Sequence, residues 1–134
     1  HELMNDHSFS RDRLVQVDQN LKLLKKVLRS GDFEAFTNIV ELEALTLHAM
    51  MMTSNPYYLL IKPNTLNIIN EIWNYRKNTN SEVCFTLDAG ANIHMLYPKK
   101  NFTKIQKFIT EKLSKFCENG EFINDHVGNG PNKL

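Results

Sequence analysis

The segment at residues 83–98, VCFTLDAGANIHMLYP, restricts the possible folds of this chain more than any other. Two short apolar runs, at residues 83–87 and 93–97, flank a small turn at residues 88–92 that contains a glycine. In the first run every second side chain is apolar, which is the spacing of a strand with one buried face. The sequence therefore predicts two short strands joined by a tight turn.

Four longer segments have apolar side chains at three- and four-residue spacings, which predicts amphipathic helices. We expect these helices at residues 10–29, 32–53, 63–77 and 102–117. Gly31 has the position of a left-handed cap on the first helix, and Asp32 has that of an N-cap on the second. The expected buried faces of these two helices are Leu14, Val17, Leu21, Leu24 and Leu28, then Phe33, Phe36, Val40, Ala44, Leu47 and Met51.

The order of these elements predicts an α+β fold with two layers, in which helices pack on one face of a small, mostly antiparallel sheet. Residues 57–61 fit either a strand or a connector, and residues 121–127 are a candidate for a final strand. The 134 residues are expected to form one domain, and a chain of this size buries roughly two thirds of its unfolded surface.

Composition and charge exclude several classes of partner. The formal net charge is +1 and no basic block stands out, so we expect no nucleic-acid partner. No run approaches the ~20 apolar residues of a membrane helix, so we expect no membrane partner. Cys84 and Cys117 lie far apart among apolar residues, which predicts reduced thiols and a cytoplasmic location. The first residue is not methionine, which suggests a fragment.

The histidines form no recognisable catalytic or metal-binding pattern. No pair has zinc-type spacing, and no Ser-His-Asp arrangement follows from the sequence. His48 is interpreted as a core or edge histidine, and His94 as a residue with a solvent or interface role. The run at residues 50–52, three methionines, is interpreted as core filling. No glycine-rich nucleotide-binding loop is present, so we identify no cofactor-binding or metal-binding residue in this chain.

Asp88 has two possible roles at the end of the first predicted strand. The pattern alone favours an aspartate that makes local hydrogen bonds in the turn. The other role is a carboxylate directed at a ligand, with the glycine allowing the ligand to come close. Asp88 is expected to point to the same side as Thr86, and strand alternation predicts burial, which is costly for a carboxylate without a partner.

Residues 85–92, FTLDAGAN, resemble the T-(M/F/L)-D-A-G-P-N segment of the diphosphomevalonate decarboxylase family, which belongs to the GHMP kinase superfamily. Residues 43–49, EALTLHA, and residues 53–56, TSNP, are similar to the helix of that family that ends in His-Ala and a proline turn. The resemblance extends over residues 11–127. One departure is Ala91, which stands where the family commonly has proline.

The resemblance implies conversion of mevalonate 5-diphosphate and ATP to isopentenyl diphosphate, ADP, phosphate and carbon dioxide. It implies that Asp88 is the catalytic carboxylate, which accepts the hydroxyl proton and orients the oxygen for phosphoryl transfer. Ala89 and Gly90 would let the substrate approach, and His1 would lie near the substrate cleft. The chain would be the C-terminal domain of a two-domain homodimeric enzyme, inactive alone, with ATP and Mg²⁺ bound mainly by the absent N-terminal domain.

Two other functions remain open. The chain is also compatible with a related small-molecule kinase of the same superfamily that does not decarboxylate its product. The third interpretation is a non-catalytic α+β dimerisation module in which Asp88 is a turn residue. Product analysis separates the first two, and an Asp88→Asn variant separates both from the third.

Overall fold

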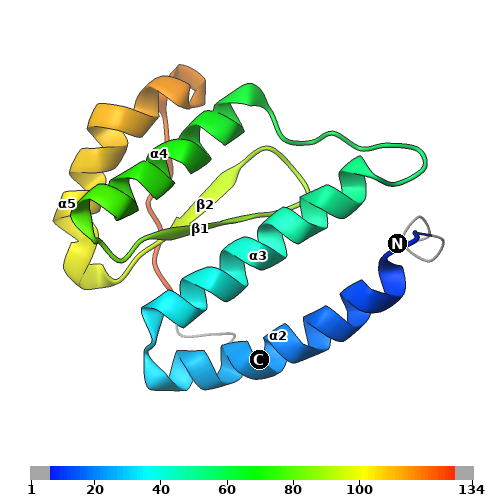
Figure 1. Ribbon diagram of the computed structural model, residues 1–134. Helices are drawn as coiled ribbons and strands as arrows, with labels where there is room; N and C mark the ends of the chain where they lie inside the picture. Colours follow the sequence, from blue (N-terminus) through cyan, green and yellow to red (C-terminus); the bar gives the residue numbers. More distant parts are fainter. Residues whose placement is uncertain (1–6, 129–134) are drawn as a thin grey trace, which may run out of the picture.

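The computed structural model describes residues 7–128 and combines long helices with a small sheet (Figure 1). The main elements are α2 (Ser10–Ser30), α3 (Phe33–Met52), α4 (Pro63–Thr79), β1 (Cys84–Leu87), β2 (Ile93–Leu96) and α5 (Phe102–Phe108). Helix α3 packs along β1, and α2 packs on α3, so α3 lies between α2 and the strands (Figure 1). The predicted α+β fold is confirmed.

The two strands pair antiparallel with the turn between them. Cys84 lies opposite Leu96, and Leu87 lies opposite Ile93. The core forms where β1 meets α4, α5 and the turn after α5. Its fully buried apolar side chains include Phe85, Ile72, Ile105 and Val83.

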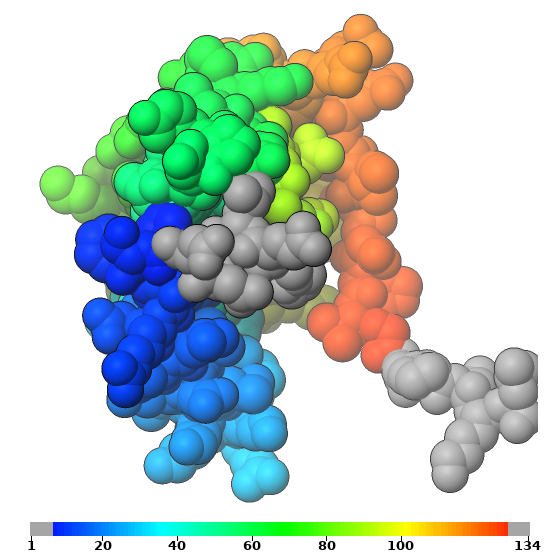
Figure 2. Space-filling model, turned by 90° about the vertical axis from the view of Figure 1, so that its right-hand side faces the viewer, coloured from blue at the N-terminus to red at the C-terminus, as the bar shows by residue number. Residues whose placement is uncertain are grey.

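The helix predicted at residues 102–117 is α-helical only in its first part. It begins as α5 and continues through a π-helical turn, Ile109–Leu113, and a 3-10 turn, Ser114–Phe116. Residues 57–61 form a connector, and residues 121–127 have no regular secondary structure, so the candidate strand at 121–127 was wrong. Figure 2 shows this final segment, orange to red, along the side of the molecule away from α2.

Helix α2 has the predicted bounds but not the predicted buried face. Leu14 is 70% exposed and Leu28 is 65% exposed, and no residue of α2 is fully buried. The half-buried face instead carries Arg13, Gln16, Asn20, Leu24 and Val27. Of the predicted row only Leu24 lies on this face, and the polar side chains beside it face α3, where Arg13 pairs with a carboxylate.

Helix α3 also buries two polar residues, Thr37 and Glu41, that its apolar pattern did not predict. Its buried residues are Thr37, Glu41, Ala44, His48 and Met50. Ala44 belonged to the expected stripe, and His48 and Met50 were interpreted as core residues, whereas burial of Thr37 and Glu41 was not expected. Buried polar groups are tolerated when they are hydrogen-bonded, and Glu41 and His48 both have partners. Within residues 7–128, no helix combines the length and the apolar character that crossing a membrane requires.

Candidate functional site

The turn at residues 88–92 is held at both ends by buried side chains from two helices. His48 on α3 places Nε2 2.9 Å from the backbone oxygen of Asp88. The N–H of Gly90 donates to the same oxygen at 2.7 Å. On the other side of the glycine, the Thr65 hydroxyl on α4 donates to the backbone oxygen of Ala91 at 2.8 Å. The backbone of the turn is therefore anchored from α3 and α4.

The carboxylate of Asp88 leaves the sheet and points to solvent. Its Oδ2 lies 3.1 Å from Nε2 of His94, and its side chain is 85% exposed. Among residues 7–128, Oδ1 has no hydrogen-bond partner. The predicted burial of Asp88 was wrong, because β1 ends at Leu87 and the carboxylate lies beyond the covered part of the sheet. His94 lies opposite Thr86 in the sheet. Because Asp88 contacts His94, Asp88 points to the same side as Thr86, as the sequence predicted.

The backbone beside the carboxylate is open. A Cβ atom built on Gly90 would meet nothing within 4 Å, and Gly90 is not in the left-handed region. Neither packing nor conformation within the described residues therefore requires glycine at this position. Ala89 is exposed. The space above Ala89 and Gly90 suits the close approach of a ligand. His1 lies outside the residues that the structure describes.

The two histidines that contact Asp88 differ in environment. His48 is 1% exposed, so its interpretation as a core residue is confirmed, but its contact with Asp88 was not predicted. His94 is exposed, as predicted, and its contact with Asp88 was also missed. The signal was present, because antiparallel pairing across a short turn brings residue 94 back toward residue 88.

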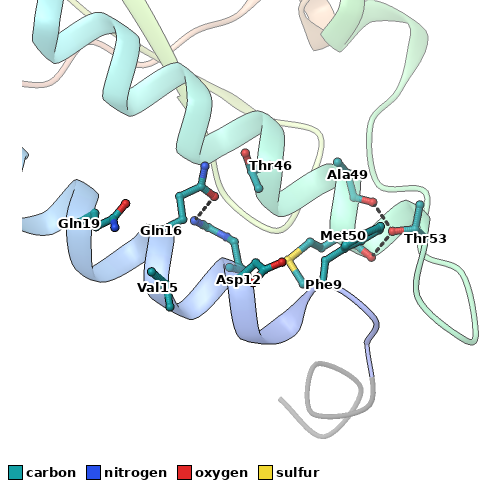
Figure 3. A pocket seen from close by; sticks show the side chains of 10 residues that line it. Phe9, Asp12, Val15, Gln16, Gln19, Thr46, Ala49, Met50 and Thr53 are labelled. Atoms are coloured by element: carbon teal, nitrogen blue, oxygen red, sulfur yellow. Dashed lines mark hydrogen bonds between the residues drawn. The ribbon is translucent and has the colours of Figure 1, made fainter.

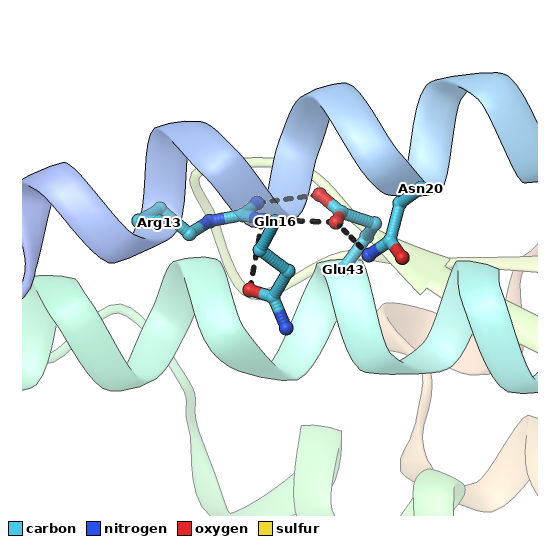
Figure 4. Close-up of polar contacts among 4 residues, drawn as sticks. All are labelled: Arg13, Gln16, Asn20 and Glu43. Carbon is cyan, nitrogen blue, oxygen red and sulfur yellow. Dashed lines mark hydrogen bonds and ion pairs between the residues drawn. The ribbon is translucent and has the colours of Figure 1, made fainter.

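A bidentate ion pair fixes α2 on α3 (Figure 4). Nη1 of Arg13 donates to Oε1 of Glu43 at 2.9 Å, and Nη2 donates to Oε2. Asn20 also donates to Oε1 of Glu43. The hydrogen bonds from Arg13 lower the pKa of Glu43, although partial burial acts in the opposite direction.

A second ion pair fixes α3 to α4 and to the start of the sheet. Arg76 donates Nη1 to Oε1 of Glu41 at 2.6 Å and Nη2 to Oε2 at 3.0 Å. Trp73 donates its indole N–H to the same carboxylate at 2.9 Å, and Arg76 also donates to the Val83 carbonyl. The hydrogen bonds to Glu41 raise the pKa of Arg76. Both pairs hold the helix that carries His48.

Two surface hollows lie away from the turn. The first has a volume of about 600 Å³ and lies between α2 and the last turns of α3, where Phe9, Gln16, Met50 and Thr53 line it (Figure 3). At 100° per residue, Met50 and Thr53 lie on the opposite side of α3 from His48. The second, about 800 Å³, lies at the start of α3. Neither is lined by Asp88.

The described residues do not form a metal centre by themselves. Among residues 7–128, no three His, Cys, Asp or Glu side chains converge in a group that could hold an ion. The turn contributes one carboxylate, whereas Mg²⁺ prefers a shell of several oxygen ligands. Both cysteines are free, and burial raises the pKa of the Cys84 thiol to about 11. These groups add no metal ligand set or activated nucleophile to the site.

Comparison with known proteins identifies several decarboxylases that are similar to this chain. A curated phosphomevalonate decarboxylase of Haloferax volcanii is 22% identical over 110 residues, which cover 82% of this chain and 34% of the relative. A structure described as MDDEF in complex with MVAPP, AMPPCP and magnesium is 26% identical and has a TM-score of 0.75. The match covers 82% of this chain and 33% of that one. A mevalonate diphosphate decarboxylase from Legionella pneumophila is 27% identical with a TM-score of 0.77, over 84% of this chain and 36% of that one.

The chain thus spans about a third of the length of these relatives. The family model for the mevalonate 5-diphosphate decarboxylase C-terminal domain matches residues 6–133, which is nearly the whole sequence. The turn with Asp88 and both helices that anchor it lie inside that match. The chain belongs to the mevalonate 5-diphosphate decarboxylase family and corresponds to its C-terminal domain.

Proposed function

We propose that this chain is the C-terminal part of an ATP-dependent decarboxylase that converts mevalonate 5-diphosphate to isopentenyl diphosphate, ADP, phosphate and carbon dioxide. The observation that carries the proposal is the Asp88 carboxylate at the end of β1. One of its oxygens is held by His94, and the other faces solvent beside an open glycine turn. Membership of the decarboxylase family supports the reaction class.

Asp88 accepts the proton of the tertiary hydroxyl of the substrate and directs that oxygen toward the γ-phosphate of ATP. Oδ1 is the suitable atom, because Oδ2 is occupied by His94. In a loose phosphoryl transfer, orientation of the oxygen contributes more than early deprotonation. Loss of the new phosphate then drives release of carbon dioxide. The backbone of Ala89 and Gly90 leaves room for the substrate beside the carboxylate.

The activity belongs to a longer, two-domain protein, and the domain alone is inactive. ATP and Mg²⁺ bind mainly to another part of that protein, because this sequence has no phosphate-binding loop. A related structure is described with MVAPP, AMPPCP and magnesium, which supports this set of ligands. We also propose that the assembly is a cytoplasmic homodimer.

The test is product analysis with the full-length protein, ATP and mevalonate 5-diphosphate. ADP and carbon dioxide should form in equal amounts, and Asp88→Asn should lower turnover by about 100-fold or more. Asp18→Asn is the matched control, because this carboxylate is exposed and belongs to α2, and α3 lies between α2 and the strands. Full turnover in Asp88→Asn would remove the role given to Asp88.

Two alternatives are decided by the same assay. ADP without carbon dioxide would indicate the kinase of the same superfamily. A second substrate, mevalonate 5-phosphate, is included because the curated relative is named a phosphomevalonate decarboxylase. If carbon dioxide forms from mevalonate 5-phosphate but not from mevalonate 5-diphosphate, the decarboxylation is supported and the substrate is the monophosphate. No product from either substrate with a folded full-length protein would favour the non-catalytic module.

A further inference from the structure

We propose that His48 and Thr65 are a pair of positioning residues that fix the backbone on both sides of Gly90 and thereby aim the Asp88 carboxylate. The inference rests on the proposed function, because it gives Asp88 a reaction to serve. Neither side chain reaches the open side of the turn, so neither is proposed to contact the substrate. Their role is carried through Asp88.

The first anchor is the imidazole of His48. It is 1% exposed, and its Nε2 lies 2.9 Å from the backbone oxygen of Asp88. A carbonyl oxygen can only accept a hydrogen bond, so Nε2 carries the hydrogen in this contact. The Gly90 N–H donates to the same oxygen, which therefore accepts two hydrogen bonds. Loss of the imidazole would leave the turn with a local bond but no bond to α3.

The second anchor is the hydroxyl of Thr65, which is 3% exposed in the first turn of α4. Its Oγ1 donates to the Ala91 oxygen at 2.8 Å and accepts from the N–H of Lys62 at 3.3 Å. A hydroxyl can donate one hydrogen bond and accept another, so the Thr65 hydroxyl links the start of α4 to the part of the turn that follows Gly90. The two anchors thus come from different helices and grip the backbone before and after the glycine.

The consequence concerns the direction of the carboxylate. Asp88 and Ala89 are exposed, so few packing contacts hold their side chains in place. The position of the Asp88 Cα atom, and with it the direction of its side chain, depends on the anchored carbonyls. A displacement of about 1 Å can cost about 100-fold in rate when a reaction depends on alignment. Buried donors on rigid helices are the means by which such sites are kept aligned.

The test compares paired variants of the full-length enzyme. His48→Leu and Thr65→Val keep side-chain volume but remove the donor, whereas His48→Gln and Thr65→Ser retain a donor. We expect kcat to fall about 10-fold to 100-fold in the first pair with little change in KM. The second pair should recover most of kcat. Hydrogen exchange of peptides covering residues 88–92 should be faster in the first pair, measured without substrate.

Met50→Ala is the control for general loss of stability. Met50 is buried on α3 two residues from His48 but faces away from the turn. This variant should have a lower melting temperature, normal kcat below that temperature and unchanged exchange at residues 88–92. An equal loss of kcat in Met50→Ala, or unchanged kcat in His48→Leu, would overturn the proposal.

Failure of this inference is distinguishable from failure of the proposed function. If Asp88→Asn abolishes turnover while His48→Leu and Thr65→Val keep it, the function stands and the anchors are structural. If the unmodified enzyme forms no product, the function fails, and the catalytic role of the anchors fails with it. Exchange at residues 88–92 then still decides whether His48 and Thr65 hold the turn.

Discussion

Nε2 of His94 lies 3.1 Å from Oδ2 of Asp88, at the turn end of the β1–β2 hairpin. The contact joins an exposed imidazole to an exposed carboxylate, six residues apart in the sequence. It leaves the remaining carboxylate oxygen on the solvent side. Under the proposed function the pair would orient the carboxylate, and as an exposed contact it is expected to contribute little to the stability of the fold.

His94→Ala should change the free energy of unfolding by less than about 1 kcal/mol at pH 7. The physical reason is that solvent screens exposed ion pairs and that ordering two side chains costs entropy. Urea denaturation of the variant and the unmodified protein measures the difference. A loss above about 2 kcal/mol would contradict an orienting role and make the pair structural.

Glu43→Gln should flatten the decline of stability in acid. Hydrogen bonds from Arg13 lower the pKa of Glu43 in the folded state, so the unfolded chain binds more protons as the pH falls. The pair therefore stabilises the fold above the ordinary glutamate pKa of 4.5, and this stabilisation is lost as the pH falls through the lower folded pKa. Urea midpoints measured between pH 7 and pH 3 give the slope of stability against pH for Glu43→Gln and for the unmodified protein.

The control for this pH series is Glu111→Gln, in an exposed pair with Lys107 on the surface after α5. Its slope should match that of the unmodified protein, because a screened pair shifts stability little. Parallel slopes for Glu43→Gln and the unmodified protein would show that Arg13 does not perturb Glu43.

Glu41→Ala should lower the free energy of unfolding by about 1–3 kcal/mol. Removing one partner of a fully buried pair costs about 3–5 kcal/mol, and Arg76 is partly exposed, which reduces the penalty. Trp73 is the single tryptophan of the chain and donates to Glu41, so its fluorescence should also change. Equilibrium unfolding followed at this tryptophan gives both quantities.

Glu82→Ala provides the comparison, because Glu82 pairs with Lys100 at the surface. It should change stability by less than about 1 kcal/mol. Equal effects of Glu41→Ala and Glu82→Ala would contradict the structural role of the Glu41–Arg76 pair.

Cys84 should resist alkylation in the folded protein, while Cys117 should react faster. Burial raises the pKa of Cys84 to about 11, so very little thiolate exists near pH 8, and the side chain is inaccessible. Cys117 is half-buried, and burial raises its pKa as well. Mass spectrometry after iodoacetamide treatment measures each rate. Unfolding in guanidinium should make the rates similar, and faster labelling of Cys84 in the folded state would contradict its burial.

The sequence predicts the helices, the two strands and the place of Asp88 directly after β1, because these follow from local periodicity and turn chemistry, but it does not predict the exposure of the Asp88 side chain. It does not predict which face of each helix is buried. In α2 the regular leucine row identified an apolar face, but the half-buried face carries Arg13, which pairs with a residue 30 positions away. Such a pairing depends on tertiary geometry that periodicity does not contain.

The anchors of the turn illustrate the same limit at the site. Thr37, Glu41, Ala44 and His48 are spaced by four, three and four residues, so a polar stripe on one face of α3 was visible in the sequence. The pattern alone did not show that α4 would satisfy Glu41 or that the turn would satisfy His48, and the buried hydroxyl of Thr37 has no hydrogen-bond partner among the described residues. His48 lies 40 positions from the carbonyl that it binds. Candidate residues could be located, but their partners could not.

The exposed leucines of α2 are also expected to affect the solubility of the chain. Leu14, Leu21 and Leu28 project from the outermost helix and contribute to no core cluster. An apolar strip of this kind on a free surface promotes concentration-dependent association and loss from solution. Replacing these three leucines with glutamine should raise the solubility limit of the separately expressed domain without changing its melting temperature much, so the helix offers a route to crystals and NMR samples.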